Sequence, residues 1–162
     1  NWLSRTFQNL YFAPRPMNME QEIVTRSPEE THRVAEDLLK TLKPGAVLAL
    51  HGELGAGKTC FVQGLARAMG VRRAVGSPTF TLINEHGGDG MRLYHVDLYR
   101  IRDSHEALGL GLDDCIHGDG ITAIEWAERV ADLLPKTTIH IRMSPGRLPE
   151  ERHIVIQRGG DS

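Results

Sequence analysis

The sequence predicts an α/β fold with a mostly parallel central sheet, helices on both faces and one inserted β-hairpin. Three observations support this class. Short apolar runs alternate with helical patterns, a glycine-rich loop joins one such run to a helix, and two strand-like segments flank a tight turn. A chain of 162 residues is long enough to bury one core, so we expect a single domain.

The glycine-rich loop is the most specific feature of the chain. Residues 46–51 read AVLALH, typical of a strand buried on both faces, and Gly52 to Thr59 follow with the spacing G-x-x-x-x-G-K-[ST]. Glycines let the backbone turn with positive φ and bring N–H groups around a phosphate. Lys58 can reach the outer phosphates, and the Thr59 hydroxyl can ligate Mg²⁺.

The residues after Gly57 are expected to form a helix, whose N-terminus favours a bound anion. Phe61, Leu65 and Met69 recur at helical spacing, and Gly70 stands where a C-terminal cap belongs. A chance glycine-rich turn predicts neither the strand before it nor the helix after it. The sequence therefore predicts a nucleotide-phosphate site in a P-loop NTPase fold.

The other elements follow from similar signals. Ser27, Pro28 and Glu30 form a helix start, with the serine as N-cap, and this helix is expected to run to about Leu42. The remaining expected elements are strands at 80–86, 91–97, 121–126, 137–143 and 153–157, one or two short helices within 103–117, and a helix at 127–134.

Both ends of the chain are expected to lie outside the folded domain, which we assign to residues 19–158. Residues 1–18 hold four aromatic residues and two prolines without a periodic pattern, and residues 9–12 resemble part of a protease-cleavage tag. The alternative is a natural arm that docks on a partner. Residues 159–162 read GGDS, which is typical of a frayed tail.

The composition argues against several classes of protein. A formal net charge of −2 makes no strong electrostatic case for binding nucleic acid, although a local basic patch is compatible with it. Cys60 and Cys115 are far apart and form no CxxC pair, so neither zinc nor a disulfide framework is supported. Without a membrane-length apolar run or a secretion signal, we expect a cytoplasmic protein that binds neither membrane nor DNA.

Two acidic residues directly follow apolar runs, where a carboxylate is costly to bury unless it meets a cation or a donor. Asp97 ends the run LYHV, and Glu125 ends ITAI. We expect both at strand ends near the phosphate loop, one holding Mg²⁺ and one orienting the attacking water. The residues leave open which acid does which, and surface capping is the alternative for each.

Two threonines are weaker candidates. Thr79 belongs to the segment 77–79, SPT, which either senses a terminal phosphate as a switch-like loop or is a plain turn before a strand. Thr31 lies in the first turn of the helix that follows Ser27, where its hydroxyl either meets a nucleotide or is solvated or bonded locally.

Four motifs occur in order along the chain: HGELGAGKT, SPTFTL, YHVDLYR and IEWAERV. In this combination the chain resembles the bacterial TsaE (YjeE) family, small P-loop ATPases of the tRNA threonylcarbamoyladenosine pathway. The resemblance covers residues 20–158. Many families share the phosphate loop, so the other three motifs make the match specific.

The resemblance implies a weak ATP hydrolase that uses ATP or ADP and Mg²⁺ and is stimulated by the partners TsaB and TsaD. Its ATPase cycle would reset these partners while they modify an adenosine in the anticodon loop of tRNA, and its own contact with tRNA would be indirect. By position, the resemblance implies that Thr59 and Glu125 hold Mg²⁺ and that Asp97 assists the metal or the water. It places the nucleotide against Glu53, Leu54, Gly55, Ala56, Gly57, Lys58, Thr31 and Thr79.

Two other functions use the same loop. A nucleotide-gated interaction module without catalysis would let bound ATP or ADP set the shape of a docking face. A small-molecule kinase would need a lid with several arginines and a pocket for the acceptor. Arg100 and Arg102 are the only nearby pair in the sequence, and no long lid insert is visible, so the kinase is the less favoured of the two.

Overall fold

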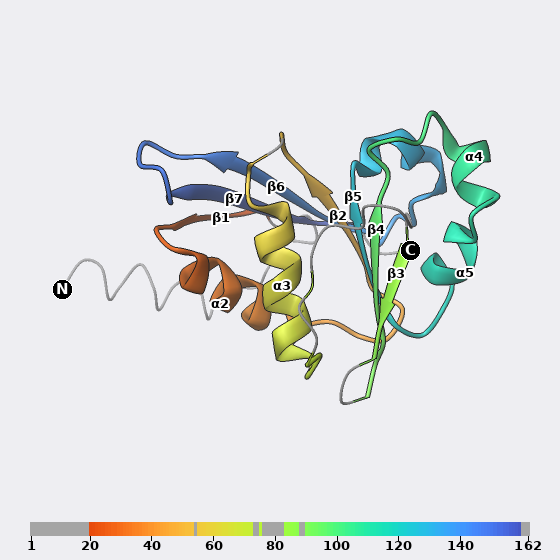
Figure 1. Cartoon of the computed structure of the whole chain (residues 1–162), viewed down its shortest axis with the longest axis horizontal. Coiled ribbons are helices and arrows are strands. Elements are labelled where there is room, and N and C mark those ends of the chain that lie inside the picture. The colour runs from red at the N-terminus through yellow and green to blue at the C-terminus, as the bar shows by residue number, and fades with distance from the viewer. Residues whose placement is uncertain (1–19, 54, 73–74, 76–82, 88–89, 160–162) are drawn as a thin grey trace.

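A computed structural model describes residues 20–53, 55–72, 75, 83–87 and 90–159 of the chain (Figure 1). Among these residues, seven strands form one sheet in the order β1-β7-β6-β2-β5-β4-β3. The strands are β1 (Glu20–Thr25), β2 (Val47–His51), β3 (Ile83–His86), β4 (Leu93–Asp97), β5 (Ile121–Glu125), β6 (Ile139–Pro145) and β7 (Arg152–Arg158).

The centre of the sheet is parallel and its flanks are antiparallel. Strands β6, β2, β5 and β4 pair in parallel, β3 is antiparallel to β4, and β7 is antiparallel to both β6 and β1. Five of the seven strands therefore point the same way, which confirms the mostly parallel sheet. The expected hairpin is confirmed as β3 and β4, with Ile83 opposite Val96.

Helices cover both faces of the sheet, as predicted. The helices are α2 (Pro28–Leu39), α3 (Lys58–Ala68), α4 (Ser104–Leu108), α5 (Leu112–Ile116) and the 3₁₀-helix η1 (Ala127–Leu133). Strand β2 shows why both faces are covered, because Leu48 and Leu50 join the core beneath α2 and α3, whereas Val47 and Ala49 join the core beneath α4, α5 and η1. Figure 1 shows α2 beside α3, away from the pair α4 and α5.

The helix α2 begins as predicted and ends earlier. The Ser27 hydroxyl accepts the N–H of Glu30 at 3.1 Å, and the Glu30 carboxylate accepts the N–H of Arg26 at 3.1 Å, so both acceptors cap the helix start. After Leu39 the chain tightens, because Thr41 and Leu42 donate to carbonyl groups only three residues back. The expected end near Leu42 was therefore wrong by about one turn.

The helix α3 has the predicted face and the predicted end. Phe61 and Leu65 are fully buried, and Gly70 adopts a φ of 80°, which only glycine adopts easily. Gly64 lets α2 and α3 come into close contact, since a Cβ on Gly64 would lie 2.7 Å from the Cα of His32. The contact with α2 thus helps to fix the position of α3 and of the loop that precedes it.

Two elements differ from expectation. Strand β1 was not predicted, because its sequence EQEIVT is mostly polar and this edge strand buries only Thr25 fully, with Ile23 packed against the core. The expected helix at 127–134 is a 3₁₀-helix broken at Val130, which has non-helical backbone angles. The short helices predicted within 103–117 are confirmed as α4 and α5, on either side of Gly109 and Gly111.

Several predicted features lie outside the described residues: the segment 1–18, Leu54, the segment 77–79 with Thr79, and the first part of the strand expected at 80–86. Within the described ranges, no helix is both long enough and apolar enough to cross a membrane.

Candidate functional site

The parallel strands bring their carboxyl ends to one edge of the sheet, where ligands bind in open α/β folds. The strand register aligns Leu50 of β2 with Glu125 of β5 and with Asp97 of β4. Residues paired in this way point to the same face of a sheet. Because Leu50 packs into the core beneath α3, both acids also face α3, whose first residue is Lys58.

The phosphate loop connects β2 to α3, and its glycines have distinct roles. Gly52 has a φ of 150° and touches β6 so closely that a Cβ would lie 2.5 Å from the carbonyl oxygen of Met143. Gly57 has a φ of 100° and begins α3 without a side chain that could cap the helix. Gly55 has a φ of 82° with open space around the position of a Cβ. These three conformations strongly favour glycine.

This loop fits a phosphate group. The first N–H groups of α3 donate no hydrogen bond to a side chain at the N-cap position, which is Gly57, so they are suited to an anionic ligand. Gly55 and Glu53 are exposed, whereas Ala56 is buried and its N–H donates to the Glu53 carbonyl at 3.0 Å. Thr59, the second residue of α3, is half-buried.

Lys58 is nearly buried, with a relative exposure of 5%. Its Nζ donates to the carbonyl oxygen of Gly52 at 2.5 Å and lies 4.1 Å from the centroid of the Trp126 ring. Trp126 has a φ of 60°, the only positive value at a non-glycine residue in the described ranges. The amine is therefore held within its own loop by a carbonyl group and by an aromatic face.

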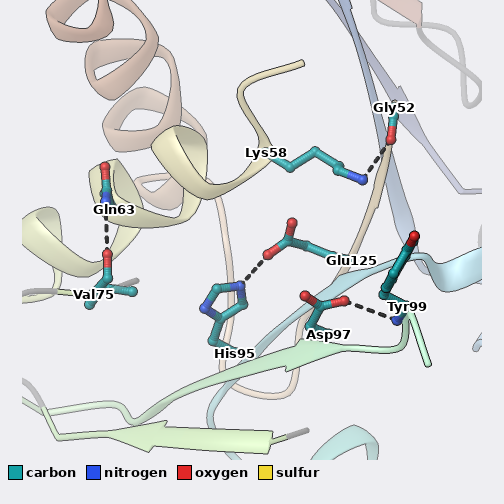
Figure 2. Close-up of polar contacts among 8 residues, drawn as sticks. All are labelled: Gly52, Lys58, Gln63, Val75, His95, Asp97, Tyr99 and Glu125. Atoms are coloured by element: carbon teal, nitrogen blue, oxygen red, sulfur yellow. Dashed lines mark hydrogen bonds and ion pairs between the residues drawn. The ribbon is translucent and has the colours of Figure 1, made fainter. Parts of the chain in front are cut away.

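Glu125 is paired with a buried histidine. The Nε2 atom of His95 lies 2.6 Å from the Oε2 atom of Glu125, and the two side chains are 0% and 5% exposed. Figure 2 shows the Glu125 carboxylate between the Lys58 amine and the His95 imidazole. The sequence analysis did not select His95, although the alternation of β4 places it on the same face as Asp97.

Asp97 is half-buried beside Glu125. Its Oδ1 atom accepts the N–H of Tyr99 at 3.0 Å (Figure 2). Burial raises the pKa of Asp97 above its ordinary value, and the nearby charge of Glu125 raises it further, while the Tyr99 N–H, His95 and Lys58 act in the opposite direction. The structure thus brings Lys58, Asp97 and Glu125 to one place.

The described residues also supply donors that suit Mg²⁺. They contain no cluster of three or more His, Cys, Asp or Glu side chains that could hold a metal on its own. Mg²⁺ at phosphate sites needs no such cluster, because it takes one or two carboxylates together with phosphate oxygens and water. The Thr59 hydroxyl with Glu125, Asp97 or both is a donor set of this kind.

Of the two weaker candidates, only Thr31 lies among the described residues, and its side chain contacts β1. Thr31 is 2% exposed, and its hydroxyl lies 2.8 Å from the hydroxyl of Thr25, so it ties α2 to β1. A role for Thr31 at the nucleotide stays a prediction. Thr79 lies outside the described residues, as does Leu54. Just before that segment, Val75 is anchored to α3, since the Gln63 side chain donates to its carbonyl at 2.8 Å.

Arg152 is a second cation at the loop, and no sequence signal pointed to it. It comes from the start of β7, and its Nε atom lies 3.4 Å from the position that a Cβ on Gly57 would occupy. Its Nη1 atom donates to the carbonyls of Pro149 and Glu151 at 2.7 and 2.9 Å, which orients the guanidinium group. Only the pairing of β7 with β6 reveals this placement.

A phosphate loop between a central parallel strand and a helix, with a buried lysine and acids on two neighbouring strand ends, defines a P-loop nucleotide-binding protein. The family model described as "Threonylcarbamoyl adenosine biosynthesis protein TsaE" matches residues 25–154. The chain belongs to the TsaE family, and its fold is the P-loop NTPase fold.

Curated relatives and a solved structure agree with this placement. The tRNA threonylcarbamoyladenosine biosynthesis protein TsaE of Bacillus subtilis (strain 168) is 43% identical over 137 residues, which cover 85% of this chain and 77% of the relative. The protein of the same name from Treponema pallidum (strain Nichols) is 42% identical over 74% of this chain and 88% of its own length. The crystal structure of Bacillus subtilus YdiB superposes with a TM-score of 0.76 at 36% identity, covering 90% of this chain and 89% of that one.

Proposed function

We propose that this chain is a Mg²⁺-dependent ATPase that supports the threonylcarbamoyladenosine modification of tRNA. Membership of the TsaE family supports the pathway. The observation that supports the chemistry is the convergence of Lys58, Glu125 and Asp97 at the N-terminus of α3. A phosphoryl group is transferred mainly through positioning and charge stabilisation, which such a constellation supplies.

The loop binds the phosphates in this proposal. Backbone N–H groups at the start of α3 surround them, and Lys58 exchanges its contact with the Gly52 carbonyl for a phosphate oxygen. Giving up that contact lowers the affinity for nucleotide. Slow ATP hydrolysis by the chain alone is expected from the family resemblance. ATP rather than GTP follows from the family alone.

The two acids differ in their distance from the loop. Glu125 pairs directly with Leu50 of the strand that leads into the loop, whereas Asp97 lies one strand further away. We therefore propose that Glu125 and Thr59 would hold the metal and that Asp97 would assist the metal or the attacking water. When bound, Mg²⁺ neutralises charge on the phosphate oxygens. The raised pKa of Asp97 makes this carboxylate a better proton acceptor than an exposed aspartate.

The partners in this proposal are TsaB and TsaD, whose complex the ATPase cycle resets between rounds of tRNA modification in the cytoplasm. The relatives' names support a place in the tRNA modification pathway. The formal net charge of −2 supports an indirect contact with tRNA, since no excess of positive charge is available to bind the phosphate backbone.

The test is ATP turnover by the purified protein, alone and with the partner pair. We expect slow turnover alone, stimulation by the partners, and loss of stimulated turnover in Glu125→Ala. The matched control is Glu128→Ala, which removes a half-exposed acid of η1 beside His51 and should leave turnover unchanged. Full stimulated turnover in Glu125→Ala would contradict the assigned role.

The contact between Lys58 and Trp126 favours a second candidate, a nucleotide-gated interaction module. A bound phosphate that draws Lys58 away from the Trp126 ring would change the start of η1, so binding alone could alter a docking face. The two candidates differ in one measurement. The measurement uses a variant that binds ATP without hydrolysing it. If gating alone suffices, this variant still supports repeated rounds of tRNA modification. If hydrolysis is needed, it supports only the first round.

A further inference from the structure

We propose that His95 is a positioning residue that holds the Glu125 carboxylate in the orientation required at the metal site. The inference rests on the proposed function, but the contact between His95 and Glu125 is present in the protein without any ligand. The distance of 2.6 Å between His95 Nε2 and Glu125 Oε2 is short for a hydrogen bond between nitrogen and oxygen.

The strands fix where both side chains start. His95 is the register partner of Ala123, and Glu125 is the partner of Asp97, so the imidazole lies diagonally behind the carboxylate on the same sheet face. A glutamate has three side-chain torsions and is otherwise free to turn. With Oε2 held by His95, the second oxygen is directed toward the N-terminus of α3 (Figure 2). Such second partners orient the groups that hold metals.

The hydrogen-bond network assigns the tautomer of His95. Its Nδ1 atom is buried and has no hydrogen-bond partner among the described residues. An ionised carboxylate only accepts hydrogen bonds, so the ring proton belongs on Nε2, where it is donated to Glu125. The bare Nδ1 lone pair is then the unpaired group, which is more readily tolerated than a buried N–H without an acceptor. Among the described residues, the His95 ring therefore hydrogen-bonds to Glu125 alone.

An ordinary core histidine does not account for this arrangement. Burying an imidazole and a carboxylate together is costly, and apolar residues would fill the same space with less penalty. Among the described residues, the other ion pairs that involve histidine have at least one half-exposed partner and span 3.2–3.6 Å. The pair of His95 and Glu125 is the exception, since both side chains are buried and lie at the proposed site.

Two variants separate positioning from simple packing. In His95→Gln the side-chain amide reaches the place of the imidazole Nε2, whereas in His95→Asn it ends near the place of Nδ1, too far from Glu125. Both variants bury an uncharged amide, so their thermal midpoints should fall by similar amounts. The measurement is the affinity for ATP by calorimetry, with Mg²⁺ and with a chelator.

In His95→Gln, we expect the gain in ATP affinity that Mg²⁺ produces to stay within about twofold of the wild-type gain. In His95→Asn, we expect that gain to be about tenfold smaller. Affinity in the chelator should not change in either variant, because Lys58 and the loop are intact. The control is His86→Asn on β3, a partly buried histidine whose Nε2 atom has no partner among the described residues. Its gain from Mg²⁺ should equal that of the wild type.

The outcomes separate this inference from the proposed function. Two results would overturn the positioning role alone. In the first, His95→Asn keeps the full gain in ATP affinity that Mg²⁺ produces in the wild type. In the second, His95→Gln loses as much of that gain as His95→Asn does. A wild type that gains nothing from Mg²⁺ overturns the proposed function, and the inference with it. A ¹⁵N spectrum of the nucleotide-free wild type needs no variant. The Nε2–H tautomer of His95 supports the role, and the Nδ1–H tautomer overturns it.

Discussion

Polar side chains gather on both faces of the sheet at the end of β2, and the two groups differ in what surrounds them. On the α3 face, the group at the proposed site (Lys58, His95, Asp97 and Glu125) joins a buried acid to a buried histidine at 2.6 Å. On the η1 face, the histidine pair (His51 and His140) is stacked, with ring centroids 5.2 Å apart and an Nε2–Nδ1 distance of 2.9 Å.

The acid beside the histidine pair is much less enclosed. Glu128 lies 3.4 Å from His51, and its side chain is 52% exposed. Burial, followed by the positive charge of Arg142, lowers the pKa of both histidines, so they are uncharged near neutral pH. Titratable groups that lie close together are therefore found on both faces of the sheet. What distinguishes the proposed site is a buried acid that has a buried histidine as its partner and lies beside the phosphate loop.

The largest expected difference between the two groups concerns their cations. Lys58→Ala should weaken ATP binding by about 100-fold, since a buried charge-assisted contact with phosphate is worth about 1.5–3 kcal/mol. The control Arg142→Ala removes the exposed cation beside the histidine pair and should change the affinity less than about twofold. Calorimetric titration measures the ATP affinity of both variants. Similar losses of affinity in the two variants would contradict the difference drawn between the two groups.

A smaller effect is expected at Thr59. Thr59→Ala removes a hydroxyl assigned to Mg²⁺, so it should reduce the gain in ATP affinity from Mg²⁺ by about tenfold and leave the affinity in a chelator unchanged. The control is Thr41→Ala, whose hydroxyl donates to the Leu38 carbonyl just after α2. If Thr59→Ala and the wild type depend on Mg²⁺ in the same way, the metal assignment is wrong.

Asp97 should respond to pH in the nucleotide-free protein. Because its folded pKa is raised, the folded state binds a proton more readily than the unfolded state, and stability is lost as the pH rises through that raised value. Asp97→Asn keeps an oxygen for the Tyr99 N–H and should raise the thermal midpoint near neutral pH by about 1–3 °C. The difference should vanish in acid. A midpoint difference independent of pH would contradict the burial argument.

The histidine pair should show the smallest effect. Its lowered pKa values mean that the unfolded state takes up protons first, so stability falls as the pH drops through the ordinary value of 6.5. The double variant His51→Gln, His140→Gln should flatten this fall between about pH 7 and pH 5. ATP affinity should stay within about twofold of the wild type. A loss like that in Lys58→Ala would make the histidine pair part of the site.

Most of the fold was predictable because its signals are local. The phosphate loop, α3 and the two acid-ending strands follow from spacing and from the alternation of side chains. Strand β1 could not be predicted in this way, because an edge strand that buries few residues shows almost no alternation of apolar and polar side chains. The break in η1 was equally hidden, since the non-helical backbone angles of Val130 leave no mark in the spacing of apolar residues.

The site was predictable in part for the same reason. Asp97 and Glu125 were recognised because an acid at the end of an apolar run is unusual. His95 sits inside such a run, where a histidine looks like core, and only the pairing of β4 with β5 shows that it meets Glu125. Arg152 reaches the loop from the far end of the chain, through a pairing of β7 and β6 that residue spacing does not indicate.

The close approach of Gly52 to β6 changes how a map of tolerated substitutions should be interpreted. Any larger residue at position 52 would collide with the Met143 carbonyl before a ligand is present. Such a map would rank Gly52 with the positions that contact the ligand. Substitutions at Gly52 would nevertheless fail because of its contact with β6 within the protein. Within the protein itself, position 55 has open space and is restricted by its positive φ, so two glycines of one loop can resist substitution for unrelated reasons.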